Sequence, residues 1–212
     1  MRREAGRGGN REGAVLPLES TLAALADYLN PSSSEEEETS GLMDEEAFAE
    51  AVAGENVLYY LPADYDGDGT EEAFGITGDD VDDWGFSNNN AIYFISSSNE
   101  VTCLVSDIYG YLSTQDEFVQ AGDTLFLVWE LSAGGSGSVS YIFGVRDGES
   151  YEPEISQCYM MFKSYNGVYY ALTSDWSEGW HDYDMLTFEY LEETGEFLLI
   201  STEDVDWEAG IY

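Results

Sequence analysis

The sequence predicts a mainly β protein made of antiparallel, four-stranded, blade-like sheets, with one or two short helices towards the N-terminus. After Gly54, short apolar runs rich in Val, Ile, Tyr and Phe alternate with turn residues, and each run has the length of a strand. The runs group loosely in fours, and such groups are typical of a partial propeller or a β-sandwich. The runs are 57–61, 72–76, 91–96, 101–105, 124–131, 139–145, 158–165, 168–173, 185–191 and 196–201.

Turn residues between these runs predict three hairpins. Asn166-Gly167 is the strongest signal, because both positions of a tight hairpin turn need positive φ. Ser98-Asn99 and Glu193-Thr194-Gly195 indicate two more. In 185–191, apolar and polar residues alternate as in a half-buried strand, whereas 57–61 is apolar throughout and is expected to be covered on both faces.

The chain divides by composition into two parts. Residues 1–40 are expected to hold a disordered start, a short helix at 20–29 and the acidic linker 32–38. Residues 41–212 are expected to form a single antiparallel β domain. This domain begins with a helix at 44–53, for which Asp44 is the N-cap and Gly54 the stop.

The chain is strongly acidic, with 6 Lys and Arg against 44 Asp and Glu and a formal net charge of −38. Such a surface repels nucleic acid and anionic lipid and attracts cations, so we expect no nucleic-acid partner. A solubilising surface adapted to high salt is an alternative interpretation. No apolar run approaches about 18 residues, so no membrane insertion is expected. Glu19 and Asp27 make the N-terminal apolar stretch a poor signal-peptide core.

Two cysteines, Cys103 and Cys158, each lie in a strand-like run. They could form a disulfide, but two buried free thiols are the favoured interpretation. A zinc site is not predicted, because the sequence has no CxxC pattern and only one histidine, His181.

The segment that carries chemistry is the acidic loop 64–72, which lies between two strand-like runs. Asp64, Asp66 and Asp68 alternate along it, and Gly67 and Gly69 allow the backbone to curl so that the three acids converge. Calcium takes roughly six to eight oxygen ligands, which such a loop can supply. Because the carboxylates would repel one another without a cation, the loop predicts a Ca²⁺ site.

A helix–loop–helix calcium site starts in the same way, but it requires a Glu where this chain has Gly75. The segment instead resembles the calcium-binding β-hairpin loops of FG-GAP and VCBS-type repeats, whose pattern D-x-D-x-D-G-x-x-[D/E] is met within residues 57–77. The resemblance implies a structural Ca²⁺ site in an extracellular or cell-surface protein. The implied ligands are Asp64, Asp66, Asp68, Thr70 and Glu72.

Other interpretations of the acids stay open. Family members usually show several copies of the loop and this chain shows one, which counts against a complete propeller. The loop could also be an Asp/Gly-rich turn that holds no ion. The clusters 79–83 and 203–206 lack the glycine scaffold and are expected to be solvated faces.

These observations favour a calcium-stabilised interaction module, with a protein or carbohydrate ligand, over an enzyme. His181 is a weak candidate for a general base, and we predict no catalytic residue. A carbohydrate-binding module or glycoside-active domain is the alternative, with Glu130 as the least arbitrary carboxylate. A third hypothesis is an acidic decoy that occupies a basic partner. The loop aromatics that could stack on sugar rings are Trp84, Trp176, Trp180 and Trp207.

Overall fold

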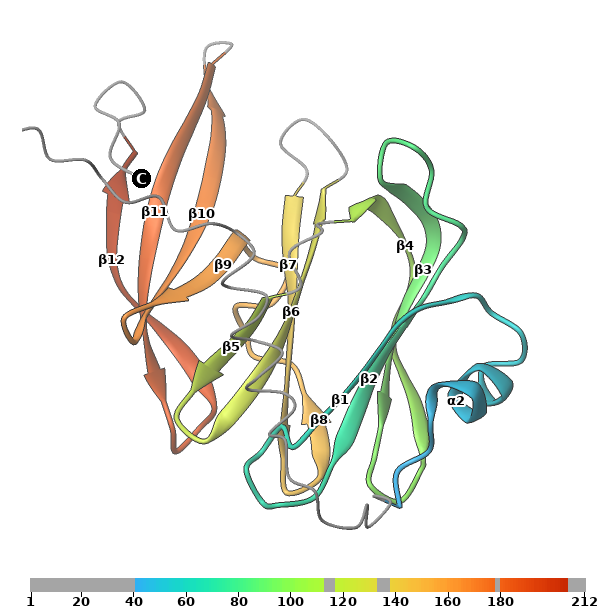
Figure 1. Ribbon diagram of the computed structural model, residues 1–212. Coiled ribbons are helices and arrows are strands. Elements are labelled where there is room, and N and C mark those ends of the chain that lie inside the picture. Colours follow the sequence, from blue (N-terminus) through green and yellow to red (C-terminus); the bar gives the residue numbers. More distant parts are fainter. Residues whose placement is uncertain (1–40, 113–116, 133–137, 178–179, 206–212) are drawn as a thin grey trace, which may run out of the picture. The chain divides into compact units, whose positions relative to one another are not determined.

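A computed structural model describes residues 41–112, 117–132, 138–177 and 180–205 (Figure 1). Contacts between Cα atoms divide the chain into Met1–Glu38 and Thr39–Tyr212, and all the described residues belong to the second unit. The helix predicted at 20–29 and the acidic linker lie outside the described residues. The one helix in the described part of the chain, α2 (Glu45–Ala51), is too short to cross a membrane.

The described chain is mainly β and antiparallel, as predicted. One sheet of eight strands has the order β1-β2-β3-β4-β6-β7-β8, with β5 paired to β6, and a second sheet has the order β12-β11-β10-β9. The strands are β1 (Val57–Ala63), β2 (Glu72–Thr77), β3 (Phe86–Ile95), β4 (Val101–Leu112), β5 (Glu117–Ala121), β6 (Thr124–Ser132), β7 (Ser138–Arg146), β8 (Glu149–Tyr151), β9 (Met160–Tyr165), β10 (Val168–Ser177), β11 (Trp180–Leu191) and β12 (Glu196–Asp204).

The grouping of strands in fours holds only for part of the chain. Strands β1 to β4 form one antiparallel meander, as the first group of runs predicts. The second predicted group is divided, because β6 and β7 extend the first sheet whereas β9 and β10 join β11 and β12. The spacing of apolar runs predicts where strands lie and where the chain turns. Which strand each one pairs with depends on contacts between segments far apart in the chain.

The three predicted hairpins are confirmed. Asn166 and Gly167 have φ of 53° and 77° and connect Tyr165 directly to its partner Val168. Asn99 and Gly195 supply the positive φ in the turns between β3 and β4 and between β11 and β12. Local turn chemistry was therefore a sound guide to which consecutive strands pair.

Helix α2 begins as predicted and lies on the outer face of β2. The Asp44 carboxylate accepts a hydrogen bond from the Ala47 amide at 2.9 Å, which caps the helix, and Gly54 follows it with a φ of 90°. Phe48 is fully buried against Ala73 and Ile95. The Phe48 ring covers Gly75, where an added Cβ would overlap its Cζ and Cε1 atoms.

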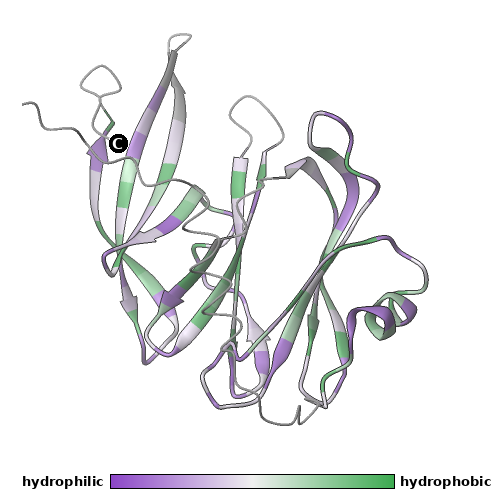
Figure 2. Ribbon diagram, viewed as in Figure 1, coloured by the Kyte–Doolittle hydropathy of each residue, from purple (hydrophilic) through white to green (hydrophobic). Residues whose placement is uncertain are grey.

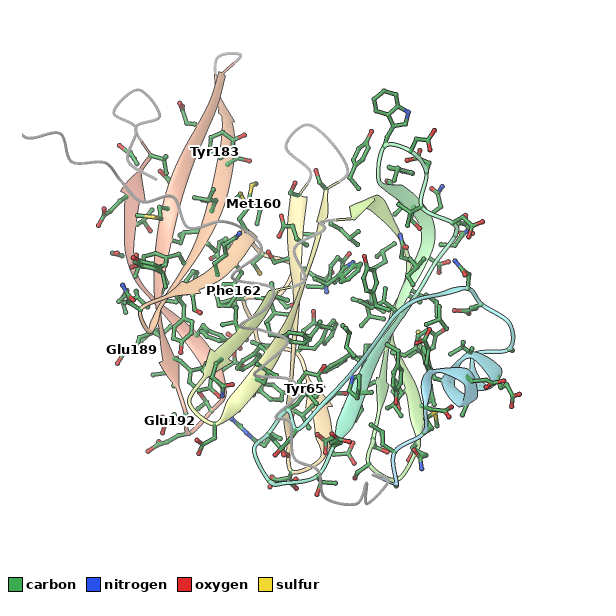
Figure 3. The ribbon with its side chains drawn as sticks, in the orientation of Figure 1. Tyr65, Met160, Phe162, Tyr183, Glu189 and Glu192 are labelled. Carbon is green, nitrogen blue, oxygen red and sulfur yellow. The ribbon has the colours of Figure 1, made fainter. Side chains whose placement is uncertain are left out.

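Strands β6 and β7 are buried on both faces and separate two cores. On one face Phe126, Val128 and Ile142 pack against the four-stranded sheet, to which Phe162 of β9 belongs. On the other face the second core packs against β2 and β3 and includes Leu127, Trp129, Tyr141, Phe143 and Tyr65. Figure 2 shows the hydrophobic residues that run along β6, and Figure 3 labels Phe162 and Tyr65 on opposite sides of it.

Both cysteines are exposed and free, so the expectation of buried thiols is wrong. Cys103 lies on β4, which pairs with β6 only at Tyr111 and Leu112 among the described residues, so most of that strand pairs with β3 alone. Cys158 lies before β9, which begins at Met160, and not within the strand as predicted. Its thiol donates to the carbonyl of Glu154 at 3.3 Å.

Candidate metal centre

The loop that the sequence singled out joins β1 to β2. Ala63 and Glu72 face each other as the last residue pair of this hairpin, so residues 64–71 form its loop. The flanking segments are paired strands, as the prediction of a β-hairpin site requires. This geometry differs from that of a helix–loop–helix site.

Tyr65 anchors the loop in the core between β2 and β6. The ring is fully buried and contacts Phe74 edge-on, with 4.8 Å between ring centroids. The phenol donates to the carbonyl of Leu61 at 2.7 Å, and the backbone carbonyl of Tyr65 accepts from the amide of Leu125 at 2.7 Å. One aromatic residue thereby fixes the start of an otherwise polar loop.

Asp64 organises the curl of the backbone. Its Oδ1 atom accepts from the amides of Gly67 at 2.8 Å and Asp68 at 3.1 Å, and its Oδ2 atom accepts from the amide of Gly69 at 2.9 Å. Gly67 and Gly69 have φ of 75° and 88°, a region that glycine enters without strain. The predicted curl around the first aspartate is therefore present.

Asp66 connects the loop to a distant turn. Its Oδ1 atom accepts from the amide of Asp68 at 3.3 Å, and its Oδ2 atom accepts from the amide of Gly148 at 3.0 Å. Gly148 belongs to the tight turn between β7 and β8. On another side, a Cβ on Gly67 would lie 3.1 Å from the carbonyl oxygen of Asp123, in the turn between β5 and β6. Two other turns of the eight-stranded sheet therefore meet this loop.

Asp64, Asp66 and Glu72 could together hold a metal ion, since each offers a carboxylate oxygen within 4.8 Å of the other two. Glu72 is 0% exposed. Its Oε2 atom is 3.5 Å from the amide of Tyr65, and its Oε1 atom has no hydrogen-bond partner. The pKa of Glu72 is raised to about 7, first by burial of the carboxyl and then by the charges of Asp66, Asp68 and Asp64, against the lowering effect of the Tyr65 amide.

An ionised carboxylate buried in this way lowers the stability of the fold unless a cation compensates its charge. Removing an ionised carboxylate from water without a partner is among the largest penalties in a fold. The two aspartates beside Glu72 increase that penalty by repulsion. An ion bound between the three carboxylates would offset both effects, so the donor set fits a hard cation.

Asp68 and Thr70 are placed differently from the three converging acids. The Oδ1 atom of Asp68 accepts from the amide of Thr70 at 2.7 Å, so this carboxylate closes the second half of the loop. Both residues are exposed. The parts predicted for Asp68 and for the Thr70 carbonyl as calcium ligands remain predictions.

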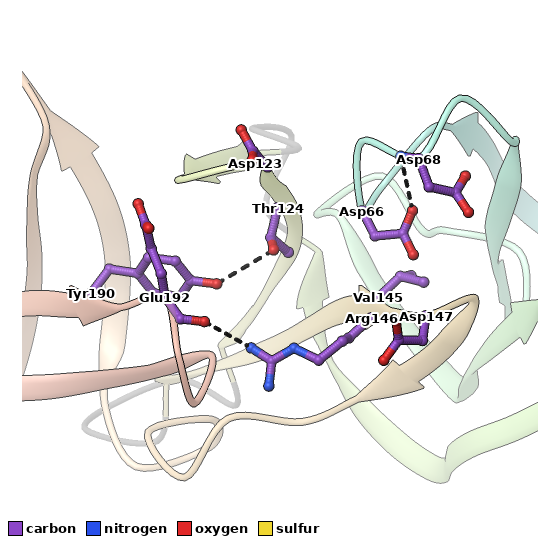
Figure 4. Close-up of a pocket in the computed structure, with 9 residues that line it drawn as sticks. All are labelled: Asp66, Asp68, Asp123, Thr124, Val145, Arg146, Asp147, Tyr190 and Glu192. Carbon is purple, nitrogen blue, oxygen red and sulfur yellow. Dashed lines mark hydrogen bonds between the residues drawn. The ribbon is translucent and has the colours of Figure 1, made fainter.

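A cavity of about 280 Å³ lies beside the loop, where the turns of both sheets approach each other (Figure 4). Arg146 crosses it and donates to the carbonyls of Thr194 at 3.0 Å and Glu192 at 3.4 Å. The guanidinium points towards Glu192 and away from the loop (Figure 4). Among the described residues, no cationic side chain contacts the carboxylates of the loop. The cavity is lined by Asp66, Asp68, Asp123, Thr124, Val145, Arg146, Asp147, Tyr190 and Glu192.

Two residues contribute to the site that were not among its predicted members, Tyr65 and Gly148. Tyr65 gave a signal, because it is an isolated aromatic between two aspartates. Gly148 gave none beyond its place in a turn, since its contact with Asp66 joins residues far apart in the chain.

The other predicted site residues do not form a catalytic group among the described side chains. The Oε2 atom of Glu130 accepts from the hydroxyl of Ser140 at 2.5 Å and from the amide of Met161 at 3.0 Å, which ties β6 to β9. Residues 79–83 are exposed, as are Glu203 and Asp204. The side chains of Trp176, Trp180 and His181, and the whole of Trp207, lie outside the described part of the structure.

Comparison of the chain with protein-family models, curated proteins and solved structures found no match. The resemblance of residues 57–77 to FG-GAP and VCBS-type loops therefore remains a prediction from sequence. Glu72 is buried, and the carboxylates of Asp64 and Asp66 lie close enough to it to share one ion.

Proposed function

We propose that the loop binds one Ca²⁺ ion through Asp64, Asp66 and Glu72, and that the ion stabilises an acidic β domain whose role is to bind a partner. Asp68 and the carbonyl of Thr70 complete the ligand set in this proposal. The observation that carries it is the Oε1 atom of Glu72, a buried carboxylate oxygen without a partner beside two further carboxylates.

Calcium fits this donor set better than other common ions. The loop offers oxygen atoms alone, which favours a hard cation over zinc or copper. Mg²⁺ demands near-ideal octahedral geometry and gives up its water reluctantly, whereas Ca²⁺ tolerates the irregular geometry of a loop. We therefore expect Ca²⁺ to bind more tightly than Mg²⁺.

A structural role for the ion follows from the position of the loop. Asp66 bonds to the turn between β7 and β8, and Tyr65 is fixed in the core. The folded chain brings the ligands together, so an ion that binds only this state stabilises it by mass action. Extracellular modules typically bind Ca²⁺ at millimolar levels, and we propose that this domain likewise works outside the cell or at its surface.

Calcium is expected to raise the melting temperature of the full chain. With a Kd in the range of about 10⁻⁴–10⁻³ M, 10 mM Ca²⁺ would stabilise the folded state by about 1.4–2.7 kcal/mol. For a domain of this size the gain corresponds to a Tm increase of roughly 3–10 °C. Differential scanning calorimetry in calcium, in magnesium and in chelator measures it, and magnesium should give the smaller shift.

The control separates site binding from general screening of a very acidic chain. The variant Asp64→Asn with Asp66→Asn removes two charges from the site, and Glu193→Gln with Glu203→Gln removes two exposed charges elsewhere. Calcium should stabilise the second variant as it does the native chain and should leave the first unchanged. Equal calcium responses in both variants would refute the site.

A further inference from the structure

An exposed group of aromatic side chains lies where β3 begins and β4 ends. Trp84, Tyr109 and Tyr111 are 84%, 61% and 44% exposed, and Phe86 contacts Tyr111 edge-on, with 5.1 Å between ring centroids. Tyr109 and Tyr111 share one face of β4, since alternate residues of a strand point the same way. We call Trp84, Phe86, Tyr109 and Tyr111 the Trp84 surface.

The turn that carries Trp84 is ordered by hydrogen bonds of its own. The Oδ1 atom of Asp82 accepts from the amides of Trp84 at 2.9 Å and Phe86 at 2.8 Å. The amide of Asp82 donates to the carbonyl of Phe86, and that of Gly85 donates to the carbonyl of Asp82, both at 3.0 Å. The turn fixes the backbone of Trp84 and leaves its indole in solvent. Tryptophan is enriched among the few residues that supply most of the binding energy of protein interfaces.

The charges around the Trp84 surface are negative. The preceding residues 79–83 contain four exposed aspartates. The hydrogen bonds that reach these carboxylates come from neutral donors: Asp79 accepts from Asn89, and Asp80 from Asn56. A groove of about 530 Å³ continues from this loop and is also lined by Glu55 and Asp107.

We propose that the Trp84 surface docks a basic segment of a protein partner. An arginine or lysine side chain would lie over the indole face while its charge is compensated by the carboxylates of residues 79–83. The complementary charge favours this occupant over a neutral glycan, whose hydroxyls could donate to the acids but would leave their negative charge uncompensated. The proposal rests on the interaction role given above and adds to it the docking surface and the chemistry of the partner.

The test measures binding of a fluorescein-labelled peptide of alternating Gly and Arg to the full chain, by fluorescence anisotropy at physiological salt. Trp84→Ala should weaken binding about tenfold, as expected for a desolvated cation–π contact at a hot spot. Tyr165→Ala is the matched control, because Tyr165 is 71% exposed but lies on β9. We expect its Kd to stay within about twofold of the native value.

A second pair of variants tests the charges. Asp80→Asn with Asp83→Asn should weaken the peptide more than Glu193→Gln with Glu203→Gln, although both remove two exposed charges. Equal losses in these two variants, or no loss in Trp84→Ala, would reduce the interaction to general polyanion attraction and overturn the proposal. Binding of a neutral oligosaccharide that is lost in Trp84→Ala, with no peptide binding, would also overturn it.

The outcome is independent of the calcium proposal. Peptide binding is measured at a temperature where calorimetry shows the chain folded both in calcium and in chelator. A chain that ignores calcium but binds the peptide through Trp84 contradicts the metal site alone. A chain that calcium stabilises but whose peptide binding is indifferent to Trp84 contradicts the docking surface alone.

Discussion

Replacing Glu72 with Gln is expected to raise the melting temperature in chelator at pH 8 and to abolish the increase that calcium produces. At this pH the native carboxyl, with its pKa raised to about 7, is mostly ionised, buried and flanked by Asp64 and Asp66. The amide of Gln carries no charge and can donate to those two carboxylates. We expect a gain of about 1–3 kcal/mol without metal, or roughly 2–12 °C in Tm.

The sign of the effect follows from the raised pKa. The folded state holds the Glu72 proton more tightly than the unfolded chain does, so the metal-free fold loses stability as the pH rises from about 4.5 through about 7. The gain from Glu72→Gln should therefore be large at pH 8 and small at pH 5. Thermal melts of the native chain and of Glu72→Gln at both pH values, each with calcium and with chelator, measure the change in Tm under the four conditions.

An opposite result would identify a different role for Glu72. If Glu72→Gln lowers the Tm in chelator at pH 8, the carboxylate stabilises the fold by itself and has no need of an ion. Glu203→Gln is the matched control, because Glu203 is exposed on β12 and its loss should leave both the Tm and the calcium response nearly unchanged.

The features that the sequence predicted well are those that neighbouring residues determine. Asn166-Gly167 can take positive φ at both positions, and Asp44 can cap the amide of Ala47, without reference to the rest of the chain. The acidic loop belongs to the same class. Asp64 bonds to amides within five residues of itself, so spacing alone predicted the curl.

The features that escaped prediction depend on segments far apart in the chain. Strand β9 could have paired with β7, but it belongs instead to the sheet of β10, β11 and β12. Contacts between apolar faces such as those of Val128 and Phe162 decide between these arrangements. The sequence does not, because both residues are apolar in either one. The exposure of Cys103 follows from the short contact between β4 and β6. The bond from Gly148 to Asp66 likewise exists only after both hairpins are in place.

Strand β2 shows how the metal loop and the fold depend on each other. Glu72 starts the strand at the site, and every residue from there to Thr77 is buried. Phe74 and Ile76 face the core that holds Tyr65, while Ala73 and Gly75 face helix α2. The helix is therefore expected to help hold in place the strand that carries Glu72.

Gly75→Ala tests this arrangement and is expected to destabilise the fold by about 1–3 kcal/mol, or roughly 2–12 °C in Tm. The new methyl would overlap Cζ and Cε1 of Phe48 and lie 2.9 Å from its Cε2 atom. Because Phe48 is fully buried, the ring can yield only by moving the helix. Gly41→Ala is the matched control, since a Cβ there meets nothing within 4 Å.

The second variant, Phe48→Leu, distinguishes overlap from a general intolerance of alanine in the strand. Leucine lacks the ring atoms that the methyl would strike, so Gly75→Ala should cost less in the Phe48→Leu background than in the native chain. A coupling of about 1 kcal/mol or more between the two sites, from urea melts of all four proteins, is the expected result. Additive losses would show that the helix does not pack on Gly75, and the support it gives to the Glu72 strand would then have to come from another contact.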